Sequence, residues 1–165
     1  MSLHPNVQIT LANSPEDIQA VKSIFTEYLT FIEAYLGQSL SFQGTQTEFA
    51  DFPHTYDALY LAKIDGKPVA ACGVKPFDTE VCELKRLYCR PDGRGNGLGL
   101  KLTQKAMQFA KAFGYKDMYL DTDHGLYHAN TVYQALGFQD IDKYYDSPMD
   151  SRFMSCNLTS LSNAQ

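Results

Sequence analysis

Ten consecutive residues, Arg90-Pro91-Asp92-Gly93-Arg94-Gly95-Asn96-Gly97-Leu98-Gly99, join two runs of different periodicity. The run before them, Val81–Cys89, is rich in β-forming residues, and the run after them has apolar residues at helical spacing. Glycines at alternate positions have no Cβ, so backbone N–H groups can turn toward a ligand and let phosphate oxygens approach closely. The N–H groups and the dipole of the following helix add to this attraction. The segment therefore predicts an anion cradle for a phosphorylated cofactor, with Arg94 adding a charge-assisted hydrogen bond of about 1.5–3 kcal/mol.

The spacing of the glycines narrows the class of cofactor. The dinucleotide fingerprint G-x-G-x-x-G fails because Leu98 and Leu100 stand where its last glycine would be. The P-loop fails as well, because Gly99 is followed by Leu100 and then Lys101. The remaining pattern, Arg94-x-x-Gly97-x-Gly99, resembles the R/Q-x-x-G-x-G/A motif with which GCN5-related N-acetyltransferases (GNAT) bind the pyrophosphate of acetyl-coenzyme A (acetyl-CoA). A tight strand-to-helix connection without a ligand is the alternative for this motif alone.

A second segment, Ala129-Asn130-Thr131-Val132-Tyr133-Gln134-Ala135-Leu136-Gly137-Phe138, matches the family pattern A-x-x-[LIV]-Y-x-x-x-G-F. Its apolar positions share one helical face, and Gly137 fits a left-handed cap at the end of that helix. The resemblance implies that Tyr133 faces the sulfur of the cofactor, whereas the segment alone also fits a half-buried core tyrosine. With both motifs in the family's order, the chain is identified as a member of the GNAT family.

The order of predicted elements agrees with this resemblance. At 165 residues the chain fits a single domain, with a motif-bearing core at about 57–158. The element order predicts an α/β fold with a mixed sheet and helices on both faces. The resemblance implies, in addition, that this sheet is splayed between the fourth and fifth strands. The predicted strands are 7–11, 57–64, 67–74, 80–89, 117–122, 138–144 and 153–158. The predicted helices are 15–36, a short one near 46–51, 98–113 and 127–136. Asp65-Gly66 predicts a type I′ hairpin turn.

Composition and charge restrict the function classes. Hydrophobic residues make up 44% and aromatic residues 13%, which is typical of a globular protein. The net charge of −5, without a basic stripe, argues against a nucleic-acid partner. No apolar run is long enough for a membrane span, and the N-terminus lacks the features of a signal peptide. The four cysteines, Cys72, Cys82, Cys89 and Cys156, fall in strand-like runs and read as small buried hydrophobes. We therefore expect a cytoplasmic protein.

The resemblance also assigns the chemistry. Acetyl-CoA is the implied cofactor, and a primary amine of a small molecule or a protein attacks its thioester directly in a ternary complex. Backbone groups of Leu87 and Cys89 are expected to pair with the pantetheine amides like an added strand. The pyrophosphate is expected on the backbone of Arg94, Gly95, Asn96, Gly97, Leu98 and Gly99. Tyr133 is the implied general acid, which protonates the departing thiolate.

The attacking amine must lose a proton, and Glu83 is the predicted base. It stands eleven residues before Arg94, the offset of the catalytic glutamate in the histone-modifying branch of the family. A strand bulge, typical of the family here, would change the face on which Glu83 lies. A surface glutamate paired with Lys85 or Arg86 is the alternative reading, and a water chain could also remove the proton.

Three further features leave alternatives open. Leu126 stands where many relatives have an asparagine that binds pantetheine, so no cofactor contact is carried over there. His124 and His128, near Asp121, raise the question of a metal, but there is no H-E-x-x-H motif, and we expect them to line or rim the acceptor pocket. The stretch at 144–146 fits either an acidic aromatic wall for an amine or a solvated edge.

Enzyme and binding module remain distinct hypotheses at this point. The leading one is an acetyl-CoA-dependent N-acetyltransferase, and the alternative is a non-catalytic acyl-CoA-binding sensor or regulatory module. A nucleotide-binding domain is disfavoured by the two failed motifs. No motif identifies the acceptor or decides between a monomer and a homodimer.

Overall fold

The computed structural model describes residues 6–37, 49–147 and 151–161. Its strands form a seven-stranded sheet in the order β1-β2-β3-β4-β5-β7-β6. The strands are β1 (Val7–Leu11), β2 (Ala58–Ile64), β3 (Lys67–Pro76), β4 (Val81–Cys89), β5 (Asp117–Asp123), β6 (Gln139–Asp140) and β7 (Ser151–Asn157). The β4–β5 pair is parallel and the other pairs are antiparallel, so the sheet is mixed as predicted.

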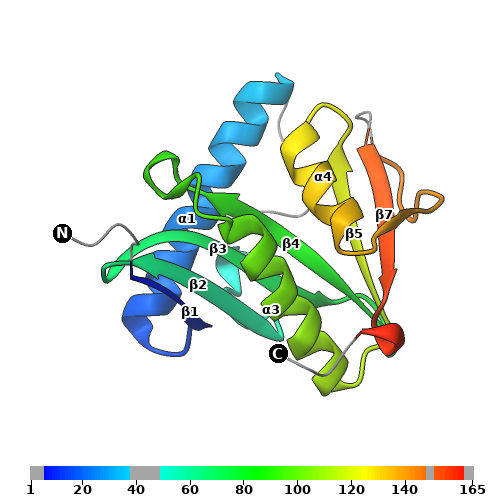
Figure 1. Cartoon of the computed structure of the whole chain (residues 1–165), viewed down its shortest axis with the longest axis horizontal. Coiled ribbons are helices and arrows are strands. Elements are labelled where there is room, and N and C mark those ends of the chain that lie inside the picture. Colours follow the sequence, from blue (N-terminus) through cyan, green and yellow to red (C-terminus); the bar gives the residue numbers. More distant parts are fainter. Residues whose placement is uncertain (1–5, 38–48, 148–150, 162–165) are drawn as a thin grey trace.

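Helices cover both faces of the sheet (Figure 1). One face carries α1 (Pro15–Leu36), and the other carries α3 (Leu98–Phe113) and α4 (Tyr127–Ala135). Capping residues bound α1 at both ends: the Ser14 side chain accepts a hydrogen bond from the Asp17 N–H at 3.1 Å, and Gly37 is left-handed with φ 69°. Apolar faces of α1 and α3 are buried against opposite sides of the sheet, which creates a core on each side.

The sheet opens between β4 and β5. These strands pair at Val81–Asp117, Cys82–Met118 and Glu83–Tyr119, and beyond this short ladder β4 continues along β3. This confirms the predicted splay. The opening brings the second half of β4 and the carboxyl end of β5 to either side of a gap in the hydrogen-bonded sheet, a place where a ligand can add backbone contacts.

A bulge in β4 lies at this opening. The register with β3 moves from Gly73–Lys85 to Ala71–Tyr88, so β4 has one residue more than its partner there. Arg86, in the bulge, has a positive φ of 60°. The extra residue reverses the alternation of side chains, so Leu87 packs with the core on the α3 side, whereas Glu83 and Lys85 belong to the α1 side.

The predicted strand at 138–144 was wrong in its second half, because β6 ends at Asp140. The chain beyond it turns inward, and the hydroxyls of Tyr144 and Tyr145 donate hydrogen bonds to Glu83 and Asp121. These side-chain hydrogen bonds hold the segment in place of the backbone hydrogen bonds that a longer strand would make.

Two other predictions concern turns and a short helix. Asp65 and Gly66 both have positive φ, 51° and 81°, which confirms the type I′ turn. Residues 46–48 of the short helix expected near 46–51 lie outside the described residues, and Phe49 and Ala50 are helical.

Candidate active site

The glycine-rich segment forms an uncapped helix N-terminus. We call residues 94–99 the cradle. Gly95 and Gly97 have positive φ, 86° and 68°, and Gly97 is the N-cap of α3. No side chain within the described residues caps α3, and its first turn has no acidic residue. The first N–H groups of α3 are therefore available to an anion brought from outside, as the sequence predicts.

Contacts within the loop fix its shape. The Asn96 side-chain amide donates to the carbonyl oxygen of Gly93 at 3.0 Å, and Nε of Arg94 donates to the carbonyl oxygen of Cys89 at 3.2 Å. The guanidinium of Arg94 also lies 5.9 Å from the centre of the Tyr88 ring. A Cβ at Gly93 would lie 2.8 Å from Cβ of Val69, so only glycine fits against β3. The cradle is thus shaped before any ligand binds.

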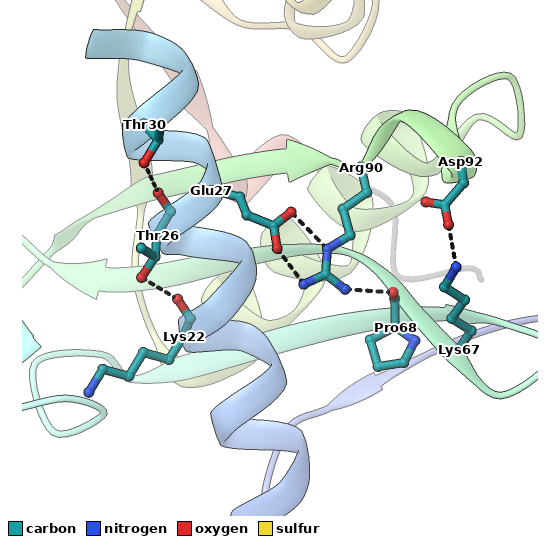
Figure 2. A network of polar contacts seen from close by, with 8 residues as sticks. All are labelled: Lys22, Thr26, Glu27, Thr30, Lys67, Pro68, Arg90 and Asp92. Carbon is teal, nitrogen blue, oxygen red and sulfur yellow. Dashed lines mark hydrogen bonds and ion pairs between the residues drawn. The ribbon is translucent and has the colours of Figure 1, made fainter. Parts of the chain in front are cut away.

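A bidentate ion pair ties this loop to α1 (Figure 2). Nε and Nη2 of Arg90 donate to the two carboxylate oxygens of Glu27 at 2.9 and 2.6 Å, and Nη1 donates to the carbonyl oxygen of Pro68 at 3.1 Å. The hydrogen bond to Glu27 raises the pKa of Arg90. A simpler pair, Lys67–Asp92 at 2.6 Å, lies nearby and is more exposed. The sequence gives no sign of the Glu27–Arg90 pair, whose members are 63 positions apart.

The cradle opens onto a large cavity of about 560 Å³. Leu87 and Cys89 line it from β4, while Ala129 and Val132 line it from α4. Its volume is in the range of small-molecule and cofactor sites. Of the cofactor contacts that the family resemblance implies, the cavity brings together Leu87, Cys89 and all of the cradle except Asn96.

A small cavity of about 50 Å³ lies next to the large one, on the α1 side of the splay. Tyr28, Ile32 and Leu126 line both cavities, so these residues mark their junction. Leu126 thus gives the junction an apolar wall. Burial raises the pKa of Tyr28 to about 12, so its hydroxyl stays protonated at neutral pH and can donate a hydrogen bond.

Tyr133 is buried with 7% of its surface exposed, and its ring packs edge-on against Phe138 at 5.8 Å. Its neighbours Ala129 and Val132 line the large cavity, and Tyr133 lies behind that wall. Burial raises the pKa of Tyr133, and the charges of Tyr28, Cys72 and Asp121 raise it further. Tyr133 itself is not among the residues that line either of the two cavities.

The carboxylate of Glu83 accepts a hydrogen bond from a tyrosine in the segment that follows β6. The hydroxyl of Tyr144 donates to Oε2 of Glu83 at 2.9 Å, while Lys85 pairs with Asp121 at 3.5 Å instead. Burial and the negative charge of Glu83 raise the pKa of Tyr144. Glu83 lies outside the residues that line the two cavities, whereas Asp121 lines the small one.

The two histidines and the stretch at 144–146 lie in different parts of the structure. His128 lines the large cavity, but His124 lines a different, outer hollow near Asp140. Within the described residues, no group of three metal-ligating side chains comes together. Asp146 is at the surface, paired with Lys143 at 3.0 Å, so the stretch at 144–146 combines two inward tyrosines with one solvated acid.

Sequence reasoning missed the residues of the junction and the small cavity. Tyr28 appears in the sequence merely as one of the apolar positions of a helix. Arg86 is 6% exposed and lines the small cavity, although an arginine in a strand usually indicates a solvated edge. The bulge that buries Arg86 has no local signal in the sequence.

The structure thus combines a mixed, splayed sheet with an uncapped glycine-rich helix N-terminus. The family profile described as the Acetyltransferase (GNAT) family matches residues 19–138. The chain belongs to this family. An uncharacterized N-acetyltransferase of Schizosaccharomyces pombe is 33% identical over 150 residues, which cover 87% of this chain and 90% of that protein. The uncharacterized N-acetyltransferase YjgM of Escherichia coli is 30% identical over 139 residues, which cover 82% of this chain and 81% of that protein.

Solved structures share the fold. A GNAT-family acetyltransferase from Staphylococcus aureus superposes with a TM-score of 0.74 at 21% identity, over 93% of this chain and 99% of that one. The PaiA N-acetyltransferase of Thermoplasma acidophilum, solved in complex with coenzyme A, superposes with a TM-score of 0.71 at 17% identity. The match covers 92% of this chain and 99% of that one. The described helices include none with the length and apolar character that a bilayer span requires.

Proposed function

We propose that the protein transfers the acetyl group of acetyl-CoA to a primary amine of a small molecule or protein, by direct attack in a ternary complex. The uncapped cradle beside the large cavity carries this proposal. Its N–H groups would hold the diphosphate, and the edge of β4 at Leu87 and Cys89 would pair with the pantetheine amides. The thioester would then reach the junction of the two cavities, and the amine would enter through the small one.

Tyr133 is the proposed general acid. The phenol carries its proton at neutral pH, and we propose that it gives this proton to the departing thiolate. Tyr133→Phe removes the proton and keeps the ring. We expect kcat to fall roughly 10- to 100-fold while the affinity for acetyl-CoA stays unchanged. A variant with wild-type kcat would remove Tyr133 from this role.

Glu83 is the proposed base, and it would act through a water molecule because it does not line either cavity. Oε2 accepts from Tyr144, and Oε1 is the oxygen proposed to receive the proton. Asp121 is the second candidate, since it lines the small cavity. The expected result for Glu83→Gln is a roughly 10-fold lower kcat at unchanged acetyl-CoA affinity. Asp121→Asn is the matched comparison, and the role passes to Asp121 if that variant alone lowers kcat.

A thiol-release assay across a panel of amines, combined with acetyl-CoA titration, tests the function as a whole. We expect binding of acetyl-CoA and amine-dependent release of free coenzyme A. Binding without turnover on any acceptor would support the acyl-CoA sensor instead.

A further inference from the structure

The small cavity has walls of opposite charge. Lys85 and Arg86 line it from β4, and Asp121 and Asp123 line it from β5. Lys85 and Asp121 form an ion pair at 3.5 Å, with 11% of each side chain exposed. Charges that are so little hydrated favour a ligand whose own charges complement them. A cavity lined by cations on one side and carboxylates on the other is complementary to a ligand that carries both signs.

Arg86 gives this cavity a group suited to a carboxylate. The bulge aims a 94%-buried arginine at the α1 side, at a positive φ that is uncommon for a residue with a side chain. A guanidinium has five N–H donors in a planar fork, which allows it to bind a carboxylate while it keeps other contacts. Its charge acts on the hydroxyl of Tyr28, where it counteracts the effect of burial. Arg86 and Tyr28 thus provide two donors near the junction.

We propose that the acceptor is a small molecule that carries a carboxylate next to its primary amine, as an α-amino acid does. Arg86 and Tyr28 bind the carboxylate, and the β5 wall with Asp121 and Asp123 attracts the ammonium group before it loses its proton. The 50 Å³ of the small cavity hold a few non-hydrogen atoms, which is the size of such a head group. This inference rests on the proposed acetyl transfer and narrows its substrate class.

The experiment compares trios of acceptors that share one side chain: an L-amino acid, its amide and the corresponding decarboxylated amine. The amide is a weaker base than the amino acid and the decarboxylated amine is a stronger one, so amine basicity cannot imitate a preference for the carboxylate. We expect the amino acid to have the highest kcat/KM of its trio, by about 10- to 100-fold, the range of a charge-assisted hydrogen bond. This ranking uses the wild-type protein and needs no variant.

Variants then assign the preference to Arg86. We expect Arg86→Gln to lower kcat/KM for the amino acid to that of its amide, and Arg86→Lys to lower it less because the charge remains. Acetyl-CoA affinity and the melting temperature show whether the fold and the cofactor site are intact. An equal loss on all three members of a trio, or a wild-type preference for the amide or the amine, would overturn the proposal.

Calorimetry with the protein–coenzyme A complex separates this proposal from the proposed function. If the amino acids bind more tightly than their amides but no acceptor releases thiol, acetyl transfer fails and the carboxylate site stands. If amines are acetylated without regard to the carboxylate, acetyl transfer stands and the carboxylate site fails.

Discussion

The two sides of the site are built in different ways. The proposed cofactor side centres on one continuous segment, the cradle, and would bind through backbone N–H groups that glycine leaves open. The proposed acceptor side is assembled from residues of α1, β4, β5 and β7, which are far apart in the sequence. Backbone recognition leaves a motif in the sequence, because it needs glycine at fixed positions. Side-chain recognition leaves none, because it depends on where the fold brings separate residues together.

This difference predicts that a substitution in the cradle changes the affinity for acetyl-CoA and not that for the acceptor. We expect this substitution to have the largest effect of those proposed here. Gly99 has open space at its Cβ position, so Gly99→Glu introduces a negative charge next to the diphosphate without a steric clash in the free protein. We expect acetyl-CoA affinity to fall roughly 100-fold or more, since like charges placed side by side cost several kcal/mol. Isothermal titration calorimetry measures it.

Gly99→Ala is the matched control, since the family motif accepts alanine there. Its affinity should stay within a few-fold of the wild type. Equal affinities for the glutamate and alanine variants would show that the diphosphate lies elsewhere.

On the acceptor side, Tyr28→Phe removes one hydroxyl at the junction and keeps the ring. We expect the KM for the amine acceptor to rise about 10-fold, the cost of one hydrogen bond to a charged group, while acetyl-CoA affinity changes less than two-fold. Steady-state kinetics with each substrate varied in turn give the two values. A larger change for acetyl-CoA than for the acceptor would contradict the division of the site into two sides.

The Glu27–Arg90 pair links the two sides, since α1 lines both cavities and Arg90 precedes the cradle. Glu27→Gln should raise the KM for acetyl-CoA about three-fold at unchanged kcat, because a bidentate contact positions the loop. Lys67→Met breaks the exposed Lys67–Asp92 pair of the same loop and should have no measurable effect. If both variants behave alike, the link to α1 has no role in cofactor binding.

The smallest effect concerns the pH dependence of kcat, which we expect not to fall at alkaline pH. The pKa of Tyr28 is raised to about 12 and that of Tyr133 is raised as well, so both phenols keep their protons above pH 10, where an ordinary tyrosine loses its own. The rate should therefore rise as the amine deprotonates and then hold a plateau up to pH 10.5. A fall of kcat near pH 10, measured at saturating substrates, would show a phenol with an ordinary pKa.

Much of the fold follows from local signals in the sequence. Ser14 and Gly37 bound α1 because a side-chain cap and a left-handed glycine are local devices. Asp65-Gly66 fixes the β2–β3 hairpin for the same reason. The cradle is also local, since its glycines act on their own backbone. For α1, the β2–β3 hairpin and the glycine-rich turn before α3, the prediction and the structure agree, and anion binding by the cradle stays a prediction.

The rest depends on contacts between distant segments. The inward turn at Tyr144 and Tyr145 requires the carboxylates of Glu83 and Asp121, which are 61 and 24 positions away. The bulge at Arg86 is defined against β3, and no pattern within β4 marks it. Because the bulge decides which way the side chains of β4 face, the acceptor side could not be predicted residue by residue.

The central claim is that the backbone of residues 94–99 binds the diphosphate of coenzyme A. Titration of ¹⁵N-labelled protein with coenzyme A, followed through backbone amide resonances, tests it directly. The account predicts large saturable shifts for the amides of the cradle, and much smaller ones when pantetheine, which has no diphosphate, replaces coenzyme A. Cradle amides that do not respond to saturating coenzyme A would contradict it.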